Sequence, residues 1–79
     1  MAERINQRRN PVIGFNIKRL RNERNLKAVE VIAKLQLKSI NVNTGIFSKI
    51  ENGRNNPTVE LLIALTDIFR CDFNEFFKQ

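Results

Sequence analysis

The sequence predicts an all-α fold, a compact domain of five short helices. Apolar residues recur at intervals of three and four along most of the chain, as on one face of a helix, and no stretch shows the alternation of a strand. Residues that favour helix starts and ends separate these runs. With 79 residues, of which 42% are hydrophobic, the chain has material for one small core and no more.

The first two helices are predicted from their end signals and apolar faces. Asn10 and Pro11 form a helix start, because Asn accepts hydrogen bonds from the free first-turn amides and Pro at the first helical position loses none. Asn25 suits the left-handed conformation that ends a helix, and a second helix then covers residues 28–37. The apolar positions of these two helices are Ile13, Ile17, Leu20, Val31, Ile32 and Leu35.

A connector and a short third helix follow. Residues 38–43 have no helical period, so they form an extended connector, and Asn43 is placed to cap the next helix. We predict the third helix over residues 44–52, where Gly53 ends it because glycine adopts the left-handed conformation without strain.

Two further helices complete the predicted domain. Thr58 caps a fourth helix with a broad apolar face, and Asp72 with Glu75 three residues later fits a capping box for a fifth. The apolar residues of these two helices are Leu61, Leu62, Leu65, Ile68, Phe69, Phe73, Phe76 and Phe77.

The composition argues against catalysis and metal binding. The chain has no His and one Cys, Cys71, so Ser-His and Cys-His catalysis, a structural zinc site and an internal disulfide all lack their residues. Gly14, Gly45 and Gly53 are too scattered to cradle a phosphate, and no run approaches the ~18 apolar residues of a membrane span. We therefore expect a cytoplasmic protein that is not an enzyme and uses no cofactor, metal or small-molecule ligand.

The charge is concentrated toward the N-terminus. The formal net charge is +6, and residues 1–27 carry eight Lys or Arg side chains against two acids. Such a distribution favours a polyanionic partner for the first two thirds of the chain, although a solvated basic surface without a partner would look the same. We predict a flexible basic arm over residues 1–10 and a single domain over residues 11–79.

The third predicted helix has two different faces. At 100° per residue, Gly45, Ser48, Lys49 and Asn52 share one side, opposite Phe47 and Ile50. A narrow polar helix of this kind fits the major groove of DNA, where Lys, Asn, Ser and Thr side chains can bond base edges or phosphates. Ordinary solvent-facing polar residues would give the same pattern, so periodicity alone leaves both interpretations open.

Three segments together resemble the lambda-repressor-like helix-turn-helix family, the Cro and xenobiotic-response-element type of regulator. They are IGFNIKRLRNERNL, IFSKIENGRNNP and TVELLIALTDIFRCDFNEFF. The resemblance runs from Ile13 to Phe77, and its most specific part is SKIENG at its distance from IKRLR. It implies a five-helix domain in which residues 28–37 support a recognition helix at residues 44–52, with a connector longer than is usual in the family.

The resemblance assigns roles to individual residues. It implies a sequence-specific regulator of transcription, a repressor that binds double-stranded DNA as a homodimer on a palindromic operator. Arg21 and Glu51 would form a mostly buried ion pair between the first and third helices, and Phe73, Phe76 and Phe77 are candidates for the dimer contact. The candidates for reading bases are Thr44, Gly45, Ser48 and Lys49, and those for phosphates are Lys38, Asn41, Asn43, Asn52, Arg54 and Asn55.

Two departures from the family pattern keep a second function open. Ala28 stands where relatives have Gln, and Gly45 gives the recognition helix no side chain at a reading position. A protein-interaction module, such as an antitoxin or adaptor that keeps the fold while binding DNA weakly, would carry such changes.

Overall fold

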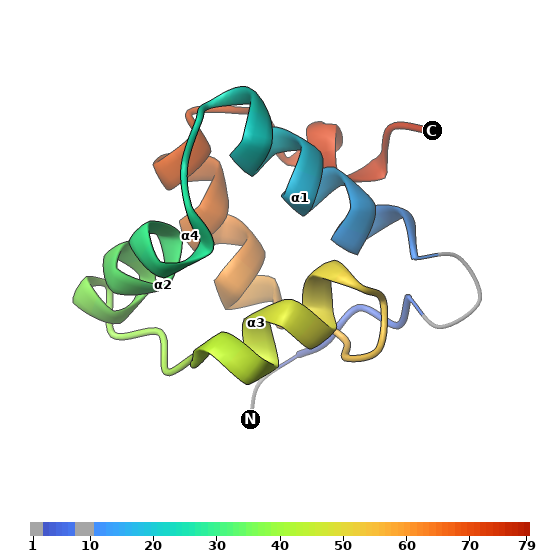
Figure 1. Ribbon diagram of the computed structural model, residues 1–79. Coiled ribbons are helices and arrows are strands. Elements are labelled where there is room, and N and C mark those ends of the chain that lie inside the picture. The colour runs from blue at the N-terminus through green and yellow to red at the C-terminus, as the bar shows by residue number, and fades with distance from the viewer. Residues whose placement is uncertain (1–2, 8–10) are drawn as a thin grey trace.

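Four α-helices and one 3-10 helix make up the fold of residues 3–7 and 11–79, the part of the chain that the computed structural model describes (Figure 1). The predicted all-α class is confirmed: this part contains one isolated antiparallel bridge, between Arg4 and Thr58, but no strand. None of its helices combines the length and apolar character needed to cross a membrane. The elements are α1 Val12–Glu23, α2 Ala28–Leu37, α3 Thr44–Glu51, α4 Val59–Phe69 and the 3-10 helix η1 Phe73–Phe77.

Most helix ends lie where the sequence predicts them. Asn43 Oδ1 accepts a hydrogen bond from the Ile46 amide at 2.8 Å, and Thr58 Oγ1 accepts one from the Leu61 amide at 3.0 Å. Asn25 and Gly53 have φ angles of 55° and 78°, in the left-handed region that ends helices.

The start of α1 differs by one residue from the prediction. Pro11 occupies the N-cap position, so the helix begins at Val12, and the predicted cap Asn10 lies outside the described residues. The Oε1 atom of Gln7 accepts a hydrogen bond from the Gly14 amide at 2.8 Å, which satisfies one of the first-turn donors of α1 from outside the helix.

The predicted fifth α-helix is instead the single 3-10 segment η1. Asp72 makes no side-chain cap, and Glu75 does not complete a capping box because its carboxylate pairs with Lys78 at 2.7 Å and Arg19 at 3.4 Å. The buried side chain of Asn16 donates to the carbonyl oxygens of Phe76 and Lys78. These bonds attach the end of η1 to α1.

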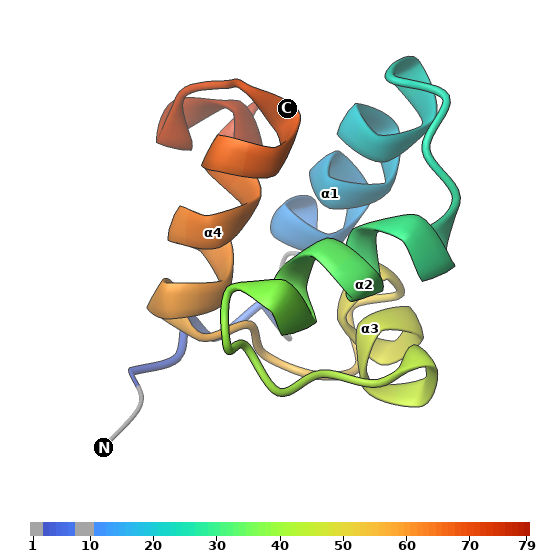
Figure 2. The ribbon, with the colours of Figure 1, turned by 90° about the vertical axis from the view of Figure 1, so that its left-hand side faces the viewer.

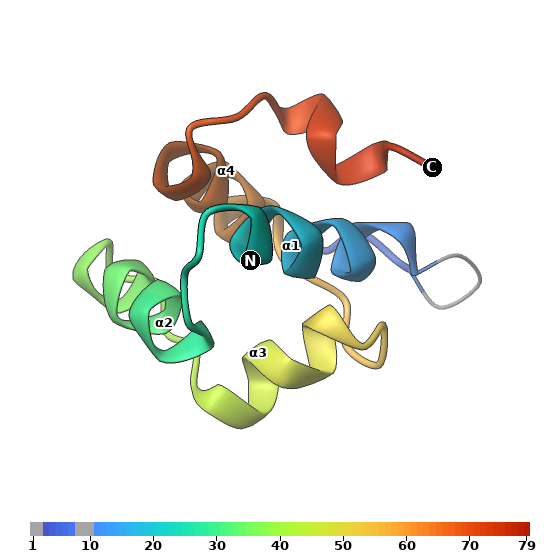
Figure 3. The same cartoon turned by 45° about the horizontal axis from the view of Figure 1, so that its top comes forward.

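The helices enclose one cluster of buried apolar side chains. α1 lies between α3 on one side and η1 on the other (Figure 3), while α2 contacts both α3 and α4 (Figure 2). The buried hydrophobic residues are Ile13, Ile17, Leu20, Val31, Ile32, Leu35, Val42, Phe47, Ile50, Leu61, Leu62, Ala64, Leu65, Phe69 and Phe76.

Residues 3–7 differ from the flexible arm that the sequence analysis assigns to residues 1–10. They run antiparallel to the loop that precedes α4 (Figure 1), with the Ile5 amide donating to the Pro57 carbonyl at 2.9 Å. The Val59 amide, in the first turn of α4, donates to the Glu3 carbonyl at 2.8 Å. Gln7 is only 1% exposed. These backbone partners lie more than 50 residues away along the chain, so the local sequence does not reveal them.

Gly14 allows α1 and α3 to approach each other closely. A Cβ atom at this position would lie 2.2 Å from the carbonyl oxygen of Ile50 and 2.8 Å from that of Glu51. No side chain fits at those distances, so any larger residue would push the end of α3 away from α1. The glycine therefore sets the position of α3.

We predict that Gly14→Ala destabilises the protein by about 1 to 3 kcal/mol, the range for overfilled packing sites. Gly45→Ala is the matched control, because a Cβ at Gly45 meets only the Asn43 side chain at an ordinary 3.5 Å. The control should stabilise α3 by up to about 1 kcal/mol. Urea unfolding of both variants measures the difference, and equal effects would refute the role given to Gly14.

Candidate nucleic-acid interface

α3 presents a polar surface to solvent and buries the opposite side. Phe47 and Ile50 are 1% and 4% exposed, respectively, and pack into the core between α1 and α2. The exposed residues of the helix and its C-cap are Thr44, Gly45, Ile46, Ser48, Lys49 and Asn52. The structure therefore brings all four predicted base-reading candidates onto one open surface.

The end of α3 continues into a loop that carries more polar groups. Arg54 is exposed and Asn55 is half-buried, and their amides both donate to the Lys49 carbonyl, at 2.7 and 3.2 Å. Asn52 Nδ2 lies 3.4 Å from Ser48 Oγ. Three of the predicted phosphate candidates, Asn52, Arg54 and Asn55, thus follow directly on the exposed side of α3.

The connector before α3 places the other three phosphate candidates differently. Asn41 is exposed, while Asn43 uses its side-chain oxygen to cap α3 and keeps its NH2 group as a donor. Lys38 forms an ion pair with Asp67 of α4. The hydrogen bond from this ammonium group, helped by its charge, lowers the pKa of Asp67. This ion pair lies at the surface, so the predicted contact of Lys38 with a phosphate would compete with it.

Arg21 and Glu51 join α1 to the last residue of α3. Arg21 Nε and Nη2 donate to the two carboxylate oxygens of Glu51 at 2.8 and 3.1 Å, and Nη1 donates to the Leu26 carbonyl at 3.1 Å. The side chains are 13% and 7% exposed. This two-bond geometry fixes the orientation of α3 as well as its distance from α1. Arg21 consequently points away from the exposed side of α3.

Gln7 is a positioning residue that sequence reasoning missed. Its Nε2 atom donates to the carbonyl oxygens of Ile50 at 2.9 Å and Asn55 at 2.7 Å. Because its Oε1 atom accepts from Gly14, one buried amide connects α1, the end of α3 and the following loop. A lone Gln in a polar segment has no periodicity or spacing that would reveal this role.

Paired and unpaired cations are distributed unevenly over the surface. The basic residues in ion pairs are Arg19, Arg21, Arg24, Lys38 and Lys78. Within the described ranges, neither Lys49 nor Arg54 has an ion-pair partner. Lys49 and Arg54 thus place unpaired positive charge on α3 and the loop after it. The other exposed cations without an ion pair in the described ranges are Arg4, Lys18, Lys27, Lys34 and Arg70. The same ranges contain no group of three or more His, Cys, Asp or Glu side chains arranged as metal ligands.

In a comparison with protein-family models, residues 48–76 match a family described as helix-turn-helix. The structure also resembles the crystal structure of an HTH_3 family transcriptional regulator from Vibrio cholerae, with a TM-score of 0.64 and 27% sequence identity. The match covers 85% of this chain and 35% of that one, so the chain spans about a third of its length. No curated protein matched the sequence.

The fold and its exposed α3 are similar to those of helix-turn-helix domains. The family model and the solved structure confirm the resemblance, drawn from the sequence, to lambda-repressor-like helix-turn-helix regulators.

We predict that Glu51→Gln destabilises the protein by about 3 to 5 kcal/mol, because it leaves the mostly buried Arg21 guanidinium without a counter-charge. Glu23→Gln is the matched control: Glu23 pairs with Arg19 on the surface, where its side chain is 54% exposed. The control should cost at most about 1 kcal/mol. Chemical unfolding measures both, and a loss in Glu51→Gln no larger than in the control would contradict the structural role of the pair.

Proposed function

We propose that this protein is a sequence-specific DNA-binding regulator of transcription, with α3 as the helix that enters the major groove. One observation carries the proposal: α3 exposes Thr44, Gly45, Ser48 and Lys49 while Phe47 and Ile50 anchor the other side in the core. The major groove is about 12 Å wide and admits a single helix. The resemblance to a transcriptional regulator supports the same assignment.

The orientation of α3 assigns different roles to its two ends. Recognition helices of this kind point their N-terminal residues at base edges. Thr44, Gly45, Ser48 and Lys49 would then face bases, while Asn52, Arg54 and Asn55 would lie where the groove meets the phosphates. The donors on Asn41 and Asn43 would reach the backbone beside the start of α3.

We further propose that the protein acts as a homodimer and represses transcription by occupying a palindromic operator. In such a dimer the two α3 helices would lie about 34 Å apart, one turn of DNA. Among the three Phe residues considered for the dimer contact, Phe76 is completely buried inside its own chain and is withdrawn. Phe77 is 42% exposed and packs against the half-buried Phe73, with ring centroids 5.6 Å apart.

Selection of bound duplexes from a random DNA pool tests the central proposal. A preferred sequence with two inverted half-sites is the expected result. If a dimer contacts about six to ten phosphates, affinity should fall by about 10³ to 10⁵ between 50 and 200 mM salt. Failure to enrich any sequence, together with tight co-purification of another protein, would favour the interaction-module alternative.

We predict that Lys49→Ala relaxes base preference at one position of each half-site, at a cost of about 1 to 3 kcal/mol against the preferred base. Lys34→Ala is the control. Lys34 is exposed on α2 and lies near Arg70 at the C-terminal end of α4, so it is not one of the residues proposed to contact DNA. Binding measured on duplexes substituted at single positions gives the answer. A uniform loss on all duplexes would assign Lys49 to a phosphate instead of a base.

We predict that Phe77→Ser weakens the homodimer at least about tenfold, as expected for an aromatic anchor at an interface. Leu37→Ser is the control, since Leu37 is 87% exposed at the end of α2, away from η1. Sedimentation equilibrium of both variants and the unmodified chain measures the dissociation constants. An unchanged dimer in Phe77→Ser would remove η1 from the interface.

A further inference from the structure

We propose that residues 3–7 form a fixed edge of the DNA interface, in which Arg4 binds a phosphate next to those contacted from the loop after α3. This inference rests on the proposed function and adds to it a contact from outside the helix-turn-helix elements.

The backbone of residues 3–7 is fixed along the loop that follows α3. Arg4 pairs with Thr58 in the antiparallel bridge, and the flanking bonds join Ile5 to Pro57 and Val59 to Glu3. The backbone amide of Gln7 also donates to Asn56 Oδ1 at 3.0 Å. The segment is therefore attached to this loop at several points along its length.

The side chain of Gln7 ties the same segment to α3 itself. It is buried, and its amide donates to carbonyl groups of Ile50 in α3 and Asn55 in the loop. Residues 3–7 are therefore attached to α3 as well as to the loop after it.

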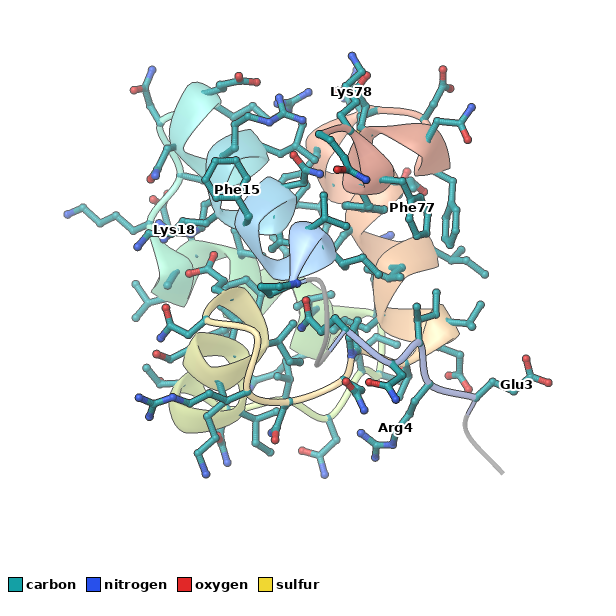
Figure 4. All side chains as sticks on the ribbon, turned by 90° about the vertical axis from the view of Figure 1, so that its right-hand side faces the viewer. Glu3, Arg4, Phe15, Lys18, Phe77 and Lys78 are labelled. Carbon is teal, nitrogen blue, oxygen red and sulfur yellow. The ribbon has the colours of Figure 1, made fainter. Side chains whose placement is uncertain are left out.

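Arg4 directs its charge outward at this place. Its Nη1 atom donates to the carbonyl oxygen of Asn56 at 3.3 Å, which uses one of the five guanidinium N–H groups and orients the rest. Arg4 is exposed and has no ion-pair partner in residues 3–7 or 11–79. In Figure 4 the Arg4 side chain points down, on the side of the molecule where α3 lies, while Glu3 points away to the right.

The geometry of DNA makes a phosphate the partner for such a cation. α3 has eight residues and a length of about 12 Å, similar to the width of the major groove. When its N-terminal end points at the bases, the residues beyond its C-terminal end lie at the edge of the groove. One phosphate charge occurs per about 1.7 Å of duplex, so a guanidinium held at that edge meets the sugar-phosphate backbone.

The test compares three variants of the full chain on the selected duplex over a series of salt concentrations. Arg4→Gln should reduce the slope of log affinity against log salt by about 0.9 for each Arg4 in contact, which is about eightfold in affinity at 0.1 M salt. The loss should be the same for all sequences, because phosphates carry no base information. Arg4→Lys should keep most of the slope, because it keeps the charge.

Arg70→Gln is the matched control, because Arg70 is an exposed arginine without an ion pair in the described residues and lies at the C-cap of α4, whereas Arg4 is bridged to Thr58 at the opposite end of this helix. It should leave affinity and slope unchanged. Circular dichroism of Arg4→Gln should match that of the unmodified chain, since the bridge to Thr58 uses only main-chain atoms. If the unmodified chain binds DNA but Arg4→Gln keeps its full slope, or Arg70→Gln loses as much, the inference is wrong. If the unmodified chain binds no DNA, the proposed function itself fails.

Discussion

The structure depends on how firmly the C-terminal half of α3 is held against α1. Three independent contacts converge there: the close approach at Gly14, the two hydrogen bonds from Gln7 and the ion pair between Arg21 and Glu51. Each restricts a different movement. Gly14 sets the distance between the helices, the fork of Arg21 sets the orientation of α3, and Gln7 attaches the loop that follows.

The other half of α3 has a contrasting environment. Its first turn is fixed by the Asn43 cap and by Phe47 beneath it, while Thr44, Gly45 and Ile46 remain exposed. A short helix that is held at one end and exposed at the other can enter a groove with little loss of conformational entropy, because its conformation is already set before binding. Gly45 also leaves the backbone of the first turn uncovered by a side chain, so that another molecule can approach it closely.

Much of this arrangement can be predicted from the sequence, because its causes are local. The helix caps at Asn43 and Thr58 and the left-handed ends at Asn25 and Gly53 need only neighbouring residues to form. The two faces of α3 follow from helical periodicity in the same way. The family resemblance, in turn, led to the ion pair between Arg21 and Glu51, two residues that are distant in the chain.

Contacts without a local pattern could not be predicted. Gln7 has its role because the chain folds back on the loop before α4, and Asn16 of α1 binds the carbonyl groups of Phe76 and Lys78 at the end of η1. Lys38 likewise resembles an available cation until α4 brings Asp67 next to it. In each case a tertiary partner outweighs the local preference of the segment.

Net charge is therefore a weaker guide to function than the pairing of charges. The excess of +6 favours a polyanionic partner, but it does not say which side of the protein such a partner meets. Ion pairs within the chain occupy Arg21, which joins α1 to α3, and Lys38, which lies shortly before α3. After these are removed, Lys49 and Arg54 remain beside each other at the end of α3, joined through the Lys49 carbonyl. A phosphate backbone is expected where such unpaired cations lie beside the exposed polar residues of a helix, as Lys49 and Arg54 do.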